Sequence, residues 1–341
     1  MELLKGIKAK IKVVGVGGAG NNTITRLKEA GIQNVELIAV NTDAQQLLAT
    51  KADRKILIGW ETTRGCGSGR DPKIGEAAAK ESEHVLKKAL EGSDMVFVTC
   101  GLGGGTGTGA GPVIADIAKK LGALVVGVVT LPFSVEGRKT MQKALEGLRN
   151  FSESVDTLIP IPNDKLVENM PDTPLPTAFR MVDEVLVNAI KGISDITTRS
   201  GLINVDFADV RAIMKDGGFG VIGLGESDSE NRAEEAVNKA LSHPLLKIDI
   251  SGAKGALINI TGGKDMTVAE TKTILEAISK RLDPEAKMAC GAVVEEGMEK
   301  KLRVLIIVVG VKPVEIEAYL PELKETISER LERELGIEFV K

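Results

Sequence analysis

Hydrophobic positions follow two alternating patterns in the first half of this chain. Short, nearly continuous apolar runs rich in Val and Ile are typical of strands buried on both faces of a parallel sheet. The segments between them repeat apolar residues every three or four positions, as on one face of a helix. The expected strands are 10–16, 35–41, 94–100, 123–131 and 157–162, and the expected helices are 20–30, 73–91, 112–121 and 136–149. This order predicts an α/β fold with a parallel sheet, which binds ligands at the carboxyl ends of its strands.

A change of pattern after residue 170 indicates a second part of the chain. Three prolines fall within residues 170–176, and a long helix with one apolar face is expected at 177–197. Beyond it, the expected strands are 219–225, 255–262, 288–295 and 302–310, and the expected helices are 231–241 and 267–281. We therefore expect a first domain at 1–172, a central connecting helix at 173–200, a smaller α+β domain at 201–312 and a C-terminal amphipathic helix at 313–341.

The last of these parts has an apolar residue at every fourth position of 314–335, among Glu, Lys and Arg. This spacing predicts an amphipathic helix, which can pack on its own body or against another subunit. Its polar face carries charges of both signs, and this is not typical of a helix that lies on a membrane surface.

The composition excludes several classes of protein. A net charge of −4 disfavours nucleic acid as a partner. The apolar runs are too short to span a bilayer and no signal segment follows the first residues, so we expect a cytoplasmic protein without direct membrane insertion. The three cysteines and two histidines lack metal-ligand spacing, so no metal site built from protein side chains is expected.

The clearest chemical signal is the sequence GLGGGTGTG at residues 101–109, directly after an apolar strand. A backbone without Cβ atoms can adopt positive φ and approach a ligand closely, so that its N–H groups converge on anionic oxygens. The expected helix at 112–121 adds its N-terminal dipole, with a proline early in the helix where the missing N–H costs nothing. These residues predict a phosphate-binding loop.

Two further glycine-rich segments change the interpretation. Residues 15–20 match GxGxxG, and together with Asp43 at the end of the second strand they are typical of an NAD-binding enzyme. However, the segment 64–72, RGCGSGRDP, is a third such loop, and three loops at strand ends suit a triphosphate held from several sides. An NAD-dependent oxidoreductase remains the alternative, but it lacks an evident hydride-handling pair and leaves residues 101–109 unexplained.

Taken together, the motifs resemble the FtsZ/tubulin family of self-assembling GTPases, and the prokaryotic FtsZ branch more than the eukaryotic tubulins. The resemblance covers roughly residues 10–310. Its matching segments, in chain order, are 17–22, 41–43, 103–109, 132–136, 161–164, 178–183 and 201–209. It implies a tubulin/FtsZ fold that binds GTP or GDP with Mg²⁺, assembles head to tail into protofilaments and forms the division-ring scaffold.

The resemblance also implies nucleotide contacts, residue by residue. The residues expected near the phosphates are Gly17, Gly18, Gly20, Asn21, Gly67, Ser68, Gly69, Gly101, Gly103, Gly104, Gly105, Thr106, Gly107 and Thr108. Those expected near the rest of the nucleotide are Asn22, Asn41, Asp43, Pro132, Glu136, Arg138, Asn163, Phe179 and Asp183. Phe179 would stack on the base, and Asp183 would select guanine because a carboxylate accepts from N1–H and the N2 amino group together. The sequence has no GK[ST] motif, so Mg²⁺ would be held mainly by phosphate oxygens and water.

Three residues at 204–209 carry the expected catalysis. On chemistry alone, Asn204 or Asp206 would cap the following helix, and Asp209 would favour its positive end. The resemblance instead implies that Asp206 and Asp209, with Asn204, reach the nucleotide of the next subunit and orient the attacking water. A non-hydrolysing or regulatory filament paralogue is the alternative.

The sequence departs from the family pattern in three places. Family members commonly have a basic residue a few positions after the glutamate of the Pro-Phe loop, and here Arg138, two residues after Glu136, is the candidate contact. Arg70 and Asp71 stand where small or amide residues are usual, and Arg70 would bring a cation toward the γ-phosphate. Family members usually end in a long linker and a short peptide that docks membrane-tethering division proteins, whereas the printed sequence stops soon after 314–335. The sequence therefore leaves open whether this protein binds membrane-tethering division proteins.

Overall fold

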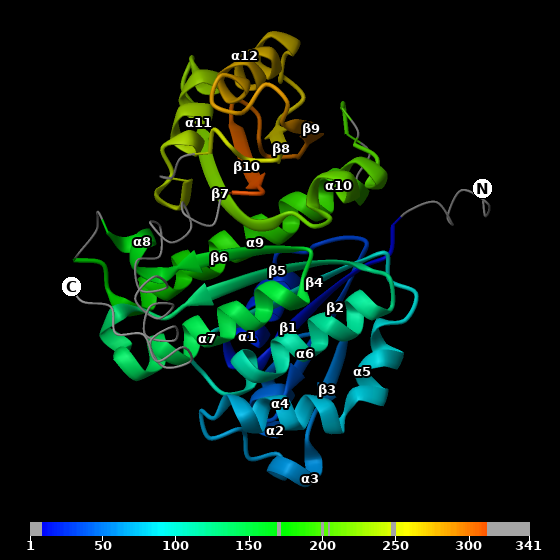
Figure 1. The fold of residues 1–341 in the computed structure, drawn as a ribbon. Helices are drawn as coiled ribbons and strands as arrows, with labels where there is room; N and C mark the ends of the chain where they lie inside the picture. The colour runs from blue at the N-terminus through cyan, green and yellow to red at the C-terminus, as the bar shows by residue number, and fades with distance from the viewer. Residues whose placement is uncertain (1–8, 169–171, 199–200, 204, 247–249, 312–341) are drawn as a thin grey trace, which may run out of the picture.

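The computed structural model describes residues 9–168, 172–198, 201–203, 205–246 and 250–311 (Figure 1). Its centre is a 10-stranded sheet with the strand order β3-β2-β1-β4-β5-β6-β7-β10-β8-β9. The strands from β3 to β6 pair in parallel, whereas β10 runs antiparallel to both β7 and β8. The predicted fold class, a parallel α/β sheet followed by a smaller α+β part, is confirmed.

The first part of the chain alternates strands with helices. Its strands are β1 (Ile11–Val16), β2 (Val35–Asn41), β3 (Arg54–Leu57), β4 (Met95–Gly101), β5 (Leu124–Leu131) and β6 (Thr157–Pro162). Its helices are α1 (Gly17–Glu29), α2 (Ala44–Ala49), α3 (Trp60–Thr63), α4 (Pro72–Glu81), α5 (Glu83–Leu90), α6 (Thr106–Lys120), α7 (Arg138–Ser154) and α8 (Asn163–Val167). All eight residues of β5 are buried because helices cover both faces of the sheet, and this accounts for the continuous apolar runs.

The central helix α9 (Leu175–Thr198) lies between the two parts and contacts strands of both. Its apolar face is buried, including Val182, Leu186 and Ile193. The second part contains α10 (Phe207–Met214), β7 (Gly218–Ser227), α11 (Arg232–Leu241), β8 (Gly255–Gly262), α12 (Val268–Ser279), β9 (Lys287–Val294) and β10 (Leu302–Val309). Only Gly218 and Phe219 of β7 pair with β6, so the two halves of the sheet meet through a short ladder.

Two of the expected helices differ from the sequence prediction, and β3, α2, α3 and α8 were not predicted. The single helix expected at 73–91 is two helices, which meet at Ser82, a residue with non-helical backbone angles (φ −97°, ψ 15°). The Ser82 hydroxyl accepts the Gly59 N–H (3.0 Å) at this break. Helix α6 begins at Thr106 rather than at 112, so Pro112 lies inside it. Tertiary packing keeps these glycine-rich residues helical in spite of their low helix propensity. The expected helix at 313–341 lies outside the described residues, and the expected domain boundaries stay a prediction.

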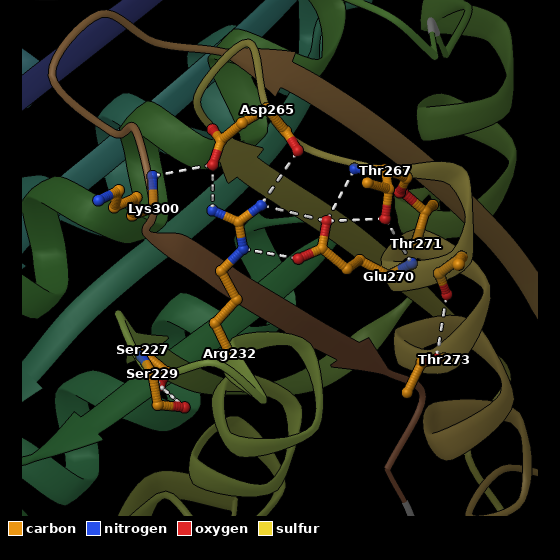
Figure 2. A network of polar contacts seen from close by, with 10 residues as sticks. Ser227, Ser229, Arg232, Asp265, Thr267, Glu270, Thr271, Thr273 and Lys300 are labelled. Carbon is orange, nitrogen blue, oxygen red and sulfur yellow. Dashed lines mark hydrogen bonds and ion pairs between the residues drawn. The ribbon is translucent and has the colours of Figure 1, made fainter.

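A buried arginine joins three segments of the second part (Figure 2). Arg232, at the start of α11, is 7% exposed and donates to both carboxylate oxygens of Glu270 (2.6 and 3.2 Å) and to Asp265 (2.7 Å). Glu270 also accepts from the N–H and hydroxyl of Thr267, and so caps α12. Asp265 accepts the Lys300 N–H from the loop before β10. The guanidinium therefore ties α11, α12 and that loop together.

Candidate nucleotide-binding site

A pocket of about 480 Å³ opens at the carboxyl ends of β1, β2 and β4, a volume in the range of small-ligand sites. The predicted residues that line it are Gly17, Gly18, Asn41, Asp43, Gly67, Ser68, Gly69, Gly101, Gly104, Gly105, Thr106, Gly107, Pro132, Glu136, Asn163 and Phe179. Sequence reasoning did not select Thr42, Gln46, Cys66 and Thr130, which also line it. Their types carry no phosphate-binding signal, although each adjoins one of the loops that did.

Two helix N-termini converge on this pocket. Val16 precedes α1 and Gly105 precedes α6, and neither residue makes a side-chain cap. The first N–H groups of a helix without a cap remain available to a ligand, and the helix dipole attracts negative charge to them. Gly17 has φ +71°, and a Cβ there would lie 3.1 Å from the Gly107 nitrogen. The absence of side chains therefore lets the two N-termini approach each other closely at the pocket.

A chain of buried hydroxyl groups joins three loops at the floor of the pocket. The Thr106 hydroxyl is 2.7 Å from that of Thr42 and 3.0 Å from that of Ser68. All three residues are buried, so these contacts are shielded from water. Thr106 therefore fixes the start of α6 against the loop after β2 and the loop before α4.

The opposite end of the pocket carries an aromatic ring and an amide. Phe179 on α9 is 43% exposed and packs edge-to-face against Phe133, with ring centroids 5.2 Å apart. Asn163 is 4% exposed, and its Oδ1 has no hydrogen-bond partner within the described part of the chain. Because a buried acceptor without a partner is costly, this oxygen points to a ligand with a donor. Glu136 accepts the Phe133 N–H (2.9 Å) and also lines the pocket.

Asp183 lies one turn of α9 beyond Phe179, so the two side chains share a face of the helix. Its carboxylate accepts from the Arg26 guanidinium of α1 at 2.7 Å. Burial raises the pKa of the Asp183 carboxyl above its ordinary value, and Arg26 opposes that shift. Asp183 is not among the residues that line the pocket.

Other predicted contacts lie behind the pocket wall or beside it. A Cβ on Gly20 would be 2.4 Å from the Thr99 carbonyl oxygen, so this glycine is needed for packing. Asn21 is buried, and its amide reaches the carbonyl oxygens of Gly15 (2.9 Å) and Val40 (3.3 Å). The remaining predicted contacts outside the lining are Asn22, Gly103, Thr108 and Arg138.

Of these, Thr108 has an evident local role. Its hydroxyl accepts the Gly103 N–H (3.0 Å), and Gly103 has φ +96°. The threonine therefore holds the turn of the glycine loop in a conformation that favours glycine.

The predicted catalytic acids lie near the amino ends of the parallel strands, opposite the carboxyl ends that form the pocket. Asp206 precedes α10 and makes no side-chain cap, and both Asp206 and Asp209 are exposed. Arg211 of α10 donates to the Gly122 carbonyl (3.0 Å), just before β5 starts. The pocket instead lies where β5 ends, because Thr130 and Pro132 line it. Eight residues of strand span about 23 Å. The acids of one chain are therefore remote from its own pocket, and Asn204 lies outside the described residues.

Oxygen ligands for a metal are sparse at this site. Among the described residues, no group of three or more His, Cys, Asp or Glu is placed to hold a metal ion. The pocket itself offers the carboxylates of Asp43 and Glu136 and the hydroxyls of its floor. Such a donor set fits a Mg²⁺ ion that takes most of its ligands from phosphate and water.

The sheet, the glycine loops and the pocket define a nucleotide-binding protein of the α/β class. A family model described as "Tubulin/FtsZ family, GTPase domain" matches residues 10–171, and one described as "FtsZ family, C-terminal domain" matches residues 218–312. The chain belongs to the FtsZ family. It binds guanine nucleotide and is a GTPase.

Several relatives match nearly the whole chain. Cell division protein FtsZ 1 of Methanocaldococcus jannaschii is 57% identical over 312 residues, which is 92% of this chain and 86% of the relative. The Archaeoglobus fulgidus protein of the same name is 51% identical over 341 residues, 100% of this chain and 91% of its own. The solved structure "FtsZ dimer, empty (M. jannaschii)" superposes with a TM-score of 0.88 at 57% identity and covers 91% of each chain. In the part of this chain that the structure describes, no helix has the length and apolar character needed to cross a membrane.

Proposed function

We propose that this protein hydrolyses GTP at the contact between two copies that assemble head to tail. The observation that carries the proposal is the separation between the nucleotide pocket and the exposed acids Asp206 and Asp209 at opposite ends of the parallel strands. Two different ends that complement each other form a heterologous contact, which repeats into a filament when its rotation does not close a ring. Each contact would complete one active site.

Binding would use the groups described above. The N–H groups of the α1 and α6 N-termini would hold the phosphates, and Phe179 would stack on the base. Asp183, behind that ring, would select guanine by accepting from N1–H and the N2 amino group. A Mg²⁺ ion held mainly by the phosphates and water would supply part of the charge neutralisation.

Hydrolysis would need a water placed in line with the γ-phosphate. Asp206 and Asp209 of the neighbouring copy would accept the hydrogen bonds of this water and orient it for attack. A carboxylate close to a triphosphate is repelled by it. Keeping both acids away from the pocket of their own chain therefore lets a single copy retain GTP until assembly completes the site.

The relatives are named as cell division proteins, and this supports a role in division. We place this protein in the cytoplasm at the division site, as a filament scaffold. Membrane-tethering division proteins are the partners expected there.

A mixing experiment tests the shared site. Asp209→Ala keeps the pocket but lacks one acid, whereas Gly107→Val keeps α10 but damages the pocket, since a Cβ at Gly107 would lie 2.7 Å from the Gly101 carbonyl oxygen. Each variant alone should release little phosphate from GTP, and their mixture should recover turnover because the pocket of one meets the acids of the other. A mixture whose chains associate but do not regain turnover contradicts the proposal.

A second measurement does not depend on either variant folding. Turnover per chain of the unaltered protein should appear only above a threshold concentration when Mg²⁺ is present. Constant turnover per chain down to dilute protein would mean that each copy hydrolyses GTP alone. Assembly with GTP but without phosphate release would instead identify a non-hydrolysing filament protein.

A further inference from the structure

The nucleotide pocket is poor in positive charge. Among the described residues that line it, Arg70 is the one positively charged side chain, and the lining also contains the carboxylates of Asp43 and Glu136. In the described part of the chain, no hydrogen-bond or ion-pair partner contacts the Arg70 guanidinium. A ligand that carries the charge of a triphosphate would therefore meet one cationic side chain from this chain.

The backbone around Arg70 is held on both sides. Ser68 is buried and bonded to the Thr106 hydroxyl, and its carbonyl accepts the Asp71 N–H (3.0 Å). Asp71 caps α4 by accepting the Lys73 N–H (2.9 Å). From α7, Lys143 donates to the Arg70 carbonyl (2.7 Å). The position of the Arg70 Cα is thus set by three segments that also shape the pocket.

Arg70 also has an unfavourable backbone conformation. Its φ is +62°, and it follows two glycines of the same loop that also have positive φ, Gly67 (+84°) and Gly69 (+58°). Glycine adopts this region without cost, whereas a residue with a Cβ does not. Arg70 therefore carries a backbone cost that glycine would not, at a position that lines the pocket.

This loop is packed closely against the start of α6. A Cβ placed on Gly105 would lie 2.7 Å from the Asp71 nitrogen, and one on Gly109 would lie 1.9 Å from the Pro72 carbonyl oxygen. The backbone of Arg70 is therefore held near the N–H groups at the start of α6, while its side chain is exposed and can reach a ligand in the pocket.

We propose that Arg70 binds the γ-phosphate of GTP and neutralises the charge that develops on it during hydrolysis. A guanidinium can donate two parallel hydrogen bonds to phosphate oxygens and keeps its proton throughout. In the reaction, a water oxygen bonds to the γ-phosphorus, the bond to the β–γ bridging oxygen breaks, and inorganic phosphate and GDP leave. The proposal rests on the proposed function of this pocket and adds a residue to it.

The proposal predicts discrimination between GTP and GDP. Helix N-termini would hold the phosphates that both nucleotides share, while Arg70 would contact only the third phosphate. Loss of the guanidinium should therefore weaken binding of a triphosphate without weakening binding of GDP. It should also slow hydrolysis, because the contact strengthens as charge moves onto the leaving group and the transferred phosphoryl group.

The test compares Arg70→Gln and Arg70→Lys with a matched control, Arg64→Gln. Arg64 belongs to the same glycine-rich segment and also has positive φ (+52°), but it pairs with Glu61 (2.8 Å) and does not line the pocket. Glutamine keeps the Cβ, so the backbone cost is the same before and after each substitution. GDP and a non-hydrolysable GTP analogue are bound to dilute protein by calorimetry, and GTP hydrolysis is measured per assembled subunit.

For Arg70→Gln we expect unchanged GDP affinity and a loss of roughly 10- to 100-fold in affinity for the GTP analogue, the range for one charge-assisted contact. Hydrolysis per assembled subunit should fall by at least the same factor, Arg70→Lys should recover part of both effects, and Arg64→Gln should match the unaltered protein. Equal losses for GDP and the analogue, or an Arg70→Gln variant indistinguishable from Arg64→Gln, would overturn the proposal. If the unaltered protein releases no phosphate, the proposed function fails, while the binding comparison still decides the role of Arg70.

Discussion

The glycines of residues 101–109 serve two separate purposes, and two alanine substitutions should distinguish them. A Cβ on Gly109 would lie 1.9 Å from the Pro72 carbonyl oxygen and 2.7 Å from the Glu76 nitrogen, inside the contact between α4 and α6. Both obstacles are backbone atoms, so a helix must move. A Cβ on Gly104 would meet nothing within 4 Å, and Gly104 lines the pocket. Its methyl group would occupy space that the phosphates need.

The magnitudes follow from these contacts. Overpacking against backbone at Gly109 costs about 3 kcal/mol, while replacing a glycine inside α6 with alanine returns about 1 kcal/mol of helix stability. We therefore expect Gly109→Ala to lower the free energy of unfolding by about 2 kcal/mol. Gly104→Ala should leave it within ~0.5 kcal/mol of the original value and weaken GDP binding at least roughly tenfold.

Urea unfolding without nucleotide, monitored by circular dichroism, measures the free energy of unfolding. Calorimetric titration with GDP measures the affinity for the nucleotide. Each variant serves as the control for the other, because both add one methyl group to the same segment. Wild-type GDP affinity in Gly104→Ala would show that the loop does not cradle the phosphates. Undiminished stability in Gly109→Ala would show that α4 and α6 are not packed as closely as described.

Two other sites give predictions. Arg232→Met should destabilise the protein by about 2 kcal/mol at pH 7, because it removes the buried cation of Glu270, whereas Arg303→Met at a more exposed pair should cost under about 1 kcal/mol. The hydrogen bond from Arg232 lowers the pKa of Asp265, and the pKa of Glu270 is also lowered because its hydrogen bonds outweigh the opposing effect of burial. The two ionised carboxylates therefore stabilise the folded state fully above their ordinary pKa values of 3.8 and 4.5, and this stabilisation is lost as the pH falls further. The difference in free energy of unfolding between Arg232→Met and the unaltered protein, measured with urea, should therefore shrink in acid. Asp183→Asn should weaken GTP binding roughly 10- to 100-fold and improve binding of xanthosine triphosphate, whose O2 accepts a hydrogen bond where guanine donates; unchanged preference in a competition assay would remove Asp183 from base selection.

Most strands were predictable because burial on both faces leaves an uninterrupted apolar signal, as in β4 and β5. The short edge strand β3 was not expected, because only one of its four residues, Ile56, is buried. The start of α6 was not predictable, since a glycine needed for close helix packing and a glycine needed for phosphate approach look the same in a sequence. The glycine motifs pointed to the loops that line the pocket, whereas Pro132, Glu136, Asn163 and Phe179 were expected only from the family resemblance. The partner of Asp183 could not be found in this way, because Arg26 is 157 residues away and no pattern links the two.

The charges at the proposed contact connect the two proposals made for the nucleotide pocket. Two carboxylates, Asp206 and Asp209, would approach a triphosphate from the neighbouring copy, and like charges 4 Å apart repel by about 4 kcal/mol at an effective dielectric constant of 20. A cation is therefore needed between them, and Arg70 is the lining side chain that can provide it from the protein. Removing Arg70 should then raise the protein concentration needed for assembly as well as slow hydrolysis. After hydrolysis and phosphate release, the acids would face Arg70 with less opposing negative charge, so Arg70 would contribute to the contact in both nucleotide states.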